Sequence, residues 1–411
     1  MRPLLLLIGL LLFASPAMAK RIEVGPDHPA KTIAGALATA RDGDEVIVHA
    51  GIYKERGLKI DRSLTLKGLG NPVIDSELQG GALLIEADNV TVEGFTIRNV
   101  ERSFTQDYAA IELNESRDFS ITNNILENCF FGIMVKKSRE GTIAFNDISG
   151  EAVEEAGSGN GIHVWHCSDV SVHNNTMYEL RDGIYLEFVK NSEIFENTST
   201  RNLRYGLHFM FSNNNRYHHN LFRDNGAGVA VMFSKKIAME HNTFTKNWGA
   251  ASYGLLLKEI YDAEINDNLF EQNTIGIYAE GSTRINYLRN TFLRNGWAVK
   301  IAGACYTNAF EDNDFVHNTF DLSYNSKLND NVFDSNYWSD YAGYDLNKDG
   351  IGDHPYRPVK LFSYVIGRTP ESIILLRSLF IDIINFSEKV SPVFTPDGLL
   401  DNSPKMKRRS E

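Results

Sequence analysis

Apolar and variable residues alternate after a series of regularly spaced glycines in the middle of the chain. The run Leu207-His208-Phe209-Met210 after Gly206 is one example, with its first and third residues apolar. Alternation with a period of two is typical of a strand that buries one face. The pattern therefore predicts a strand after each of the glycines Gly132, Gly161, Gly183, Gly206, Gly228, Gly254 and Gly276.

Asparagines recur among these strands with a spacing of about 22 residues. Self-similarity at such a period indicates a solenoid. Because no helical segment separates the strands, we expect an all-β, right-handed parallel β-helix of the pectin-lyase-like kind, with coils of about 22 residues. Asparagine suits its corners because it tolerates left-handed backbone, and stacked amides can form a ladder. The predicted ladder is Asn124, Asn146, Asn175, Asn197, Asn220, Asn242, Asn268, Asn290, Asn313 and Asn331.

The chain begins with the features of a secretory signal peptide. A basic start at Met1-Arg2-Pro3 precedes an apolar stretch over residues 4–13 and the small residues of Ala17-Met18-Ala19. This order predicts a signal peptide over residues 1–19, cleaved after Ala19, and an exported, soluble protein.

The remaining chain divides by its regularity. Residues 20–100 read as a cap and first irregular coils, with a short helix over residues 30–41 that covers the open end of the solenoid. Residues 101–340 form the regular coils. Insertions at residues 151–159 and 248–253 mark a binding face or are tolerated surface loops.

Composition excludes some partners. The net charge of −12 gives no indication of nucleic-acid binding. Cys129, Cys167 and Cys305 are odd in number and fall in different coils. We therefore expect free, packed thiols rather than a disulfide framework, with Cys167 a small packed residue.

The second and fourth residues after each glycine should point away from the solenoid interior. Neighbours in such a column lie roughly 4.8 Å apart, and residues two apart in a strand lie roughly 6.6 Å apart. His208, Met210 and Met232 then form an outward triangle, with His163 and Glu187 close by. Thioethers and imidazole together favour Cu(I). The competing interpretation is that these are isolated exposed side chains, or that a loop or partner covers them.

A loop after the last coil resembles the start of a calcium-binding loop. Its oxygen ligands would be Asp345, Asn347, Asp349 and Asp353, with Gly350 at the sixth place. Tyr356 stands where such loops carry a bidentate glutamate. Residues 341–358 are thus a calcium site or a turn that satisfies its own backbone.

Residues 359–411 differ in character from the coils. A helix is predicted over residues 370–390, and the tail from Ser391 is predicted to be flexible. The helix carries surplus apolar surface, so it caps the solenoid or docks on a partner at the membrane. The predicted docking residues are Ile373, Leu376, Leu379, Phe380 and Ile383.

Many parallel β-helices act on acidic polysaccharides, and that chemistry needs paired carboxylates or a basic residue on one outward face. The outward columns offer only Glu187 and Glu280, several coils apart. This weighs against cleavage, while sugar binding through Trp165, Tyr185 and Tyr278 stays open. The alternative functions are therefore a carbohydrate-binding or polysaccharide-modifying lyase or epimerase, and a purely structural docking platform.

Several runs together resemble the NosD family, over nearly the whole chain. They are Arg204-Tyr205-Gly206-Leu207-His208-Phe209-Met210, Tyr253-Gly254-Leu255-Leu256-Leu257-Lys258, Asn295-Gly296-Trp297-Ala298, Asp353-His354-Pro355-Tyr356-Arg357-Pro358 and Leu376-Arg377-Ser378. The resemblance implies a periplasmic, non-catalytic partner of an ABC-type ATPase and its membrane subunit. It further implies maturation of the copper–sulfur centre of nitrous oxide reductase, transient handling of Cu(I), and a copper chaperone lipoprotein as another partner. It brings no ligand set with it.

Overall fold

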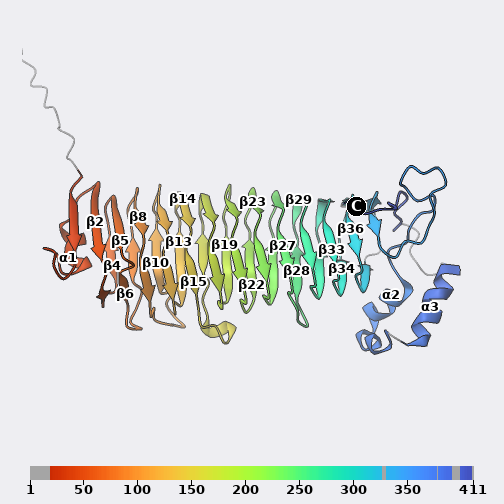
Figure 1. Ribbon diagram of the computed structural model, residues 1–411, viewed down its shortest axis with the longest axis horizontal. Coiled ribbons are helices and arrows are strands. Elements are labelled where there is room, and N and C mark those ends of the chain that lie inside the picture. Colours follow the sequence, from red (N-terminus) through yellow and green to blue (C-terminus); the bar gives the residue numbers. More distant parts are fainter. Residues whose placement is uncertain (1–18, 326–329, 377, 391–398, 410–411) are drawn as a thin grey trace, which may run out of the picture.

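The computed structural model describes residues 19–325, 330–376, 378–390 and 399–409. They form a long rod of stacked coils (Figure 1), whose strands pair in three parallel sheets. The predicted parallel β-helix is confirmed. The predicted signal peptide lies, apart from Ala19, outside the described residues.

Sheet A runs along one wall of the rod and pairs equivalent residues of successive coils, such as Ile143 with Val172. Among the described residues it has 14 strands. These are β1 (Arg21–Val24), β2 (Asp44–His49), β5 (Leu64–Leu69), β8 (Thr91–Glu93), β11 (Ser120–Thr122), β14 (Arg139–Ala144), β17 (Ser168–His173), β20 (Glu193–Phe195), β23 (Asn215–His218), β26 (Ile237–Glu240), β29 (Tyr261–Asn266), β32 (Thr283–Leu288), β35 (Ala309–Glu311) and β38 (Val332–Asp334).

Sheet B consists of short strands that supply a column of aromatic rings to the core. Phe244 and Phe270 stack with centroids 4.6 Å apart, and Phe270 and Phe292 stack at 5.0 Å. Such stacks add to the burial of apolar area that holds the coils together. The strands are β3 (Ile52–Tyr53), β6 (Val73–Asp75), β9 (Thr96–Arg98), β12 (Ile125–Glu127), β15 (Asp147–Ser149), β18 (Thr176–Tyr178), β21 (Thr198–Thr200), β24 (Leu221–Arg223), β27 (Thr243–Thr245), β30 (Leu269–Glu271), β33 (Thr291–Leu293), β36 (Asp314–Val316) and β39 (Tyr337–Trp338).

Sheet C contains the strands that follow the repeated glycines. A Cβ atom at Gly206 would lie 2.6 Å from the carbonyl oxygen of Gly228, and one at Gly228 would lie 2.4 Å from that of Gly254. Only glycine lets the coils approach this closely. The strands are β4 (Leu58–Ile60), β7 (Leu83–Ile85), β10 (Ala109–Asn114), β13 (Phe131–Lys136), β16 (Ile162–Trp165), β19 (Asp182–Glu187), β22 (Tyr205–Met210), β25 (Ala227–Met232), β28 (Tyr253–Lys258), β31 (Ile275–Glu280), β34 (Trp297–Ala302) and β37 (Phe320–Asn325).

The predicted asparagine ladder is present and buried. In each step the backbone N–H and side-chain amide of one asparagine both donate to Oδ1 of the next. Asn220 does so to Asn242 at 3.1 and 3.0 Å. The last predicted member is wrong, because Asn313 donates to Asn336 and not to Asn331. Asn331 instead accepts from Asn308 at a different corner.

The prediction that asparagine stands at the ladder positions because it tolerates left-handed backbone is wrong. The left-handed residue is the one before each ladder asparagine, for example His219 with φ 55° and His241 with φ 52°. Asn220 and Asn242 themselves do not have positive φ. Asparagine is required there because its side chain offers both a donor and an acceptor to the neighbouring coils.

The N-terminal end of the rod is covered by α1 (Ile33–Thr39), which is shorter than the predicted helix. The Thr32 hydroxyl caps it by accepting from the N–H of Gly35. Ile33, Ala36 and Leu37 bury the apolar face of the helix on the first coils. The expectation of an N-terminal capping helix is thereby confirmed.

At the other end, the prediction of a flexible tail is wrong for residues 399–409. Asp401 is fully buried and accepts three hydrogen bonds with one carboxylate oxygen, at 2.9–3.0 Å. The donors are the backbone and amide nitrogens of Asn336 and the indole nitrogen of Trp338. The tail therefore supplies the terminal acceptor of the asparagine ladder, which the last coil cannot provide itself.

Three short helices lie beside this end of the solenoid (Figure 1): α2 (Leu361–Arg368), the 3-10 helix η2 (Pro370–Leu375) and α3 (Leu379–Val390). The predicted single helix over residues 370–390 is thus interrupted, and α2 was not predicted. The interruption lets Leu376 and Ile381 both pack on a small apolar cluster with Trp297 and Phe320 of sheet C. Among the described residues, no helix is long and apolar enough to cross a membrane.

We predict that Asp401→Ala destabilises the protein by about 2–5 kcal/mol, because three buried donors lose their acceptor. Asp401→Asn should cost clearly less, since its amide oxygen can still accept. Urea unfolding followed by circular dichroism measures both. Equal stability of the alanine and asparagine variants would contradict the ladder-capping role.

Candidate metal site on sheet C

Strand pairing brings the predicted metal ligands of β22 and β25 together. His208 pairs with Ala230, and Met210 pairs with Met232. Phe209, between His208 and Met210, points inward and is completely buried, as is Leu207 before them. His208, Met210 and Met232 therefore lie on the outer side of these two strands, grouped around the small, buried Ala230.

His208 is not exposed to solvent, contrary to the expectation of an open outward triangle. Only 4% of the residue is accessible. Its ring stacks on Tyr185 with centroids 4.6 Å apart and lies against Tyr205 at 4.8 Å. Met210 and Met232 are half-buried. Aromatic side chains on the same sheet face thus cover the imidazole and leave the thioethers at the border of the solvent.

Both ring nitrogens of His208 are buried and make no hydrogen bond within the described part of the chain. The nearest charged atom, Oδ2 of Asp182, is 3.7 Å from Nδ1, which is too long for a hydrogen bond. Buried polar atoms without partners are uncommon and costly. The ring nitrogens of His208 therefore stay open to a ligand, at a buried position beside the Asp182–Arg204 ion pair.

Asp182 is a buried anion that is already satisfied. Arg204 donates to it twice, from Nε at 2.9 Å and from Nη2 at 2.5 Å, and the N–H of Tyr205 donates at 3.2 Å. Burial acts to raise the pKa of Asp182, but Arg204 and the nearby His208 together hold the pKa below its ordinary value. Asp182 is thus a poor general acid, and it supplies negative charge near His208.

His163 lies on the same face but cannot share an ion with His208. The ring of Tyr185 stands between them, with centroids 4.7 Å from His163 and 4.6 Å from His208. The two nitrogens of His163 are also buried without hydrogen-bond partners in the described structure. Burial lowers the pKa of His163 to about 4, so its imidazole is neutral at physiological pH.

The cysteines are free, as expected, and buried. Burial raises the pKa of Cys129 to about 12 and that of Cys167 to about 11. Metal ligation needs the thiolate. Cys167 instead accepts the backbone N–H of Ser138 at 3.3 Å, at a position that serine fills in other coils. The prediction that Cys167 is a small packed residue is confirmed.

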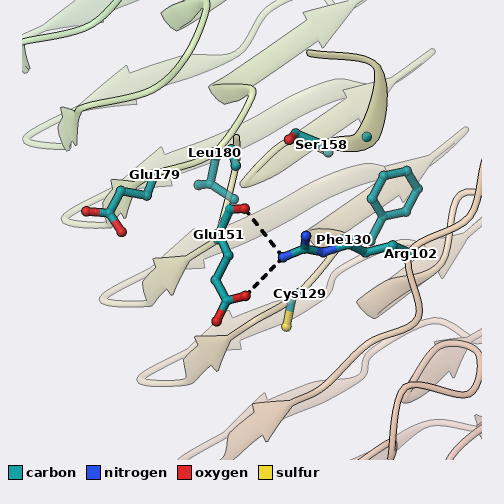
Figure 2. A pocket seen from close by; sticks show the side chains of 11 residues that line it. Arg102, Cys129, Phe130, Glu151, Ser158, Glu179 and Leu180 are labelled. Atoms are coloured by element: carbon teal, nitrogen blue, oxygen red, sulfur yellow. Dashed lines mark hydrogen bonds and ion pairs between the residues drawn. The ribbon is translucent and has the colours of Figure 1, made fainter. Parts of the chain in front are cut away.

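The insertion at residues 151–159 contains η1 (Glu155–Gly157) and protrudes from one edge of the rod (Figure 1). Arg102 holds it by donating to the backbone oxygen of Glu151 at 3.5 Å and pairing with its carboxylate at 3.3 Å (Figure 2). The hollow beneath, lined by Cys129 and Phe130, measures only ≈ 10 Å³. That is room for about one water molecule, so this hollow is no ligand site.

Comparison with known proteins shows to which family this chain belongs. A family model described as "Periplasmic copper-binding protein (NosD)" matches residues 146–343. The "Probable ABC transporter binding protein NosD" of Pseudomonas aeruginosa is 30% identical over 92% of this chain and 98% of its own. This chain belongs to the NosD family. The NosD protein of Stutzerimonas stutzeri, which carries the same description, is 29% identical over 88% of this chain and 86% of its own.

A second family model, a protein of unknown function (DUF1565), matches residues 62–217. Solved structures share the fold at low identity. A Yersinia enterocolitica family 28 exopolygalacturonase aligns with a TM-score of 0.57 at 11% identity, over 75% of this chain and 78% of its own. The periplasmic alginate epimerase AlgG aligns at 0.50 and 15% identity, over 71% of this chain and 76% of its own. These similarities concern the β-helix architecture alone.

The acidic loop of this NosD-family chain folds back on its own backbone. Asp345 accepts the N–H groups of Lys348, Asp349 and Gly350, and Asp353 accepts that of Leu346. Asn347 and Asp349 bond to each other and to nearby N–H groups. Calcium binding by Asp345, Asn347, Asp349 and Asp353 stays a prediction that this geometry does not test.

The predicted docking residues lie on and beside α3. Leu379, Phe380 and Ile383 are exposed by 74%, 59% and 55%. Leu376 is instead half-buried against the cluster formed with sheet C, and the side chain of Ile373 lies outside the described part. α3 therefore packs one face, through Ile381, and leaves an apolar face uncovered.

One cluster of candidate ligands escaped the sequence analysis. Among the described residues, the only trio of histidine, cysteine or acidic side chains whose ligand atoms all lie within 4.8 Å is Glu23, His28 and His49. These residues fall in the irregular N-terminal part. The strict repeat does not extend to this part of the chain, so it predicts no strand register there.

We predict that the free energy of unfolding falls as the pH drops from about 6.5 to about 4, because unfolded His163 binds a proton while folded His163 does not. His163 contributes on the order of 3 kcal/mol to this loss. His163→Phe keeps a ring against Tyr185 and should remove that share of the pH dependence in urea unfolding. His317→Gln, at an exposed position, is the control. A wild-type slope in His163→Phe would show that the buried imidazole is not responsible.

Proposed function

We propose that this NosD-family protein is a periplasmic accessory factor that holds Cu(I) transiently on sheet C for the maturation of nitrous oxide reductase. Copper is its cargo, not a resident cofactor. The observation that carries the proposal is the buried, unpartnered imidazole of His208 beside the paired thioethers of Met210 and Met232. The family description as copper-binding, and the descriptions of the relatives as ABC transporter binding proteins, support it.

The ligand types favour Cu(I) over harder ions. Thioether sulfur and neutral imidazole are soft and borderline donors, whereas Mg²⁺ and Ca²⁺ take oxygen ligands. Methionine carries no proton that binding would have to displace, and both ring nitrogens of His208 lack a hydrogen-bond partner within the described residues. Met210 and Met232 are half-buried, whereas His208 is covered. The two thioethers are therefore the ligands through which copper would be exchanged with another protein. His163, behind Tyr185, would hold a separate ion or serve as a relay position.

Catalysis is not part of the proposal. The carboxylate nearest to these rings, Asp182, is fully buried under Arg204 and its pKa is lowered. A lyase, hydrolase or epimerase needs an accessible acid or base that can change protonation state. The site is therefore better suited to binding and transferring a metal ion than to catalysis on a carbohydrate.

We further propose that the uncovered face of α3 docks on the membrane subunit of the ABC transporter, whose ATPase lies on the far side of the membrane. Leu379, Phe380, Ile383 and Phe386 follow one another at helical spacing and are all exposed. Membrane contact would then pass through the partner complex. A copper chaperone lipoprotein would supply Cu(I), and nitrous oxide reductase would receive it for its copper–sulfur centre.

We predict that Met210→Ala/Met232→Ala weakens Cu(I) binding at least ~100-fold, since loss of even an outer-shell partner of a metal costs 10–100-fold. His208→Ala should act in the same direction. Anaerobic titration against a competing Cu(I) chelator measures the affinity. Met406→Ala changes a half-buried methionine of the C-terminal segment and serves as the control. Wild-type affinity and stoichiometry in the double variant would exclude this site.

The docking proposal predicts that Phe380→Ser/Ile383→Ser abolishes co-purification with the ABC membrane subunit while the fold is kept. Removing two exposed apolar side chains should not unfold the protein, but it removes the centre of the proposed interface. Phe104→Ser, at a residue exposed by 86% near the first coils, is the matched control. Undiminished co-purification of the double variant would move the interface to the coils.

A further inference from the structure

Three potential ligands converge at the N-terminal end of the rod, far from the proposed Cu(I) site. Glu23 lies in β1, His49 ends β2, and His28 lies in the loop between β1 and α1; we call them the N-terminal triad. Nε2 of His49 is 2.5 Å from Oε2 of Glu23. The rings of His28 and His49 stack with centroids 3.9 Å apart at 10°. All three side chains are half-buried, so an ion from solvent can reach them.

The backbone around the N-terminal triad is held in place before any ligand arrives. The loop that carries His28 is closed by hydrogen bonds from Gly25 to Ala30 at 3.0 Å and from His28 to Gly25 at 3.1 Å. A Cβ atom at Gly25 would lie 3.0 Å from the His28 ring and 3.4 Å from Cβ of His49. Glycine at this position therefore permits the approach of the two histidines.

The position of His49 is fixed from the other side. The hydroxyl of Tyr53 donates to the backbone oxygen of His49 at 2.8 Å. Strand pairing sets Glu23 beside Ile47, two residues before His49. The carboxylate also has Arg21 nearby, with Nε 3.8 Å from Oε1, so Oε2 is the oxygen that faces the imidazoles. This order of the backbone reduces the ordering that metal binding requires, and one imidazole turns out of the stack so that both lone pairs meet the same ion.

The geometry points to a binding site for a divalent transition-metal ion, with Glu23, His28 and His49 as ligands. Two imidazoles and one carboxylate are the donor set of open Zn²⁺ sites and suit Cu²⁺ as well. Cu²⁺ should bind more tightly than Zn²⁺ by the Irving–Williams order. The triad contains no sulfur, so it differs in kind from the thioether site for Cu(I). The ion would take the place of the hydrogen bond between His49 and Glu23.

This site is independent of the proposed function. Glu23 and His49 lie in sheet A, and the sheet A strand that directly follows β22 is β23. Eight strand-to-strand steps separate β1 from β23 in sheet A, which corresponds to roughly 38 Å at 4.8 Å a step. Sheet A is also a different wall from sheet C. The triad lies outside the residues matched by either family model, which begin at residues 62 and 146. The two sites can therefore be removed separately.

The test is binding of Cu²⁺ by the untagged, processed protein, followed by isothermal titration calorimetry and by electron paramagnetic resonance. We expect one Cu²⁺ at the triad, with hyperfine structure from two imidazole nitrogens. His28→Ala and His49→Ala should each weaken binding at least ~100-fold and remove nitrogen coupling. Glu23→Gln should weaken binding while both nitrogens stay coupled. Zn²⁺ should compete with Cu²⁺ at the same site.

Two controls separate this site from the Cu(I) site and from damage to the fold. His317→Ala removes an exposed histidine elsewhere and should leave Cu²⁺ binding unchanged, as should Met210→Ala/Met232→Ala. Circular dichroism and the melting temperature report whether the triad variants are folded, and His28→Asn offers a milder loop substitution. Wild-type Cu²⁺ affinity in folded His28→Ala and His49→Ala would overturn the inference, because Glu23 and His49 would then be a hydrogen-bonded pair only.

Discussion

The register between coils is the constraint on which the rest of this protein depends. An asparagine inside the ladder, such as Asn220, gives two hydrogen bonds to the next coil and receives two from the coil before, in a fully enclosed setting. A slip of one coil by one residue would leave several buried amides without partners, at about 1–3 kcal/mol each. It would also turn the inward side chains of that strand outward. The ladder therefore fixes which residues of neighbouring coils lie side by side.

The sheet C face shows what this register makes possible. His208 and Met210 come from one coil, and Met232 from the next, so their proximity follows from strand pairing alone. The rings of Tyr185, which stacks on His208, and of Tyr205, which lies tilted against it, cover the imidazole, while Arg204 pairs with the buried Asp182 nearby. Thioether and imidazole ligands on a rigid, largely buried wall suit a soft cation that must be held briefly and then released. The C-terminal helices pack over the same sheet, nearer its end, which brings the proposed docking face and the copper face to one side of the rod.

The sequence alone was sufficient where the repeat is strict. Alternation after the glycines predicted which residues of β22 and β25 point outward, because a period of two has only two solutions. It could not predict that His208 is covered, since that depends on ring orientations at Tyr185 and Tyr205. The choice of Asn331 over Asn336 failed because asparagines stack at other corners as well, as Asn308 does on Asn331, and spacing does not distinguish these corners. Asp401 and the N-terminal triad were missed for a related reason: their partners are brought together by folding outside the regular coils.

The central claim is that Cu(I) binds between the side chains of His208, Met210 and Met232. The most direct measurement is an anomalous difference map at the copper absorption edge, from crystals of the protein loaded anaerobically with Cu(I). The account predicts a peak within bonding distance of the sulfurs of Met210 and Met232 and a ring nitrogen of His208. A well-ordered copper peak elsewhere, with no peak beside these three side chains, would contradict the proposed site.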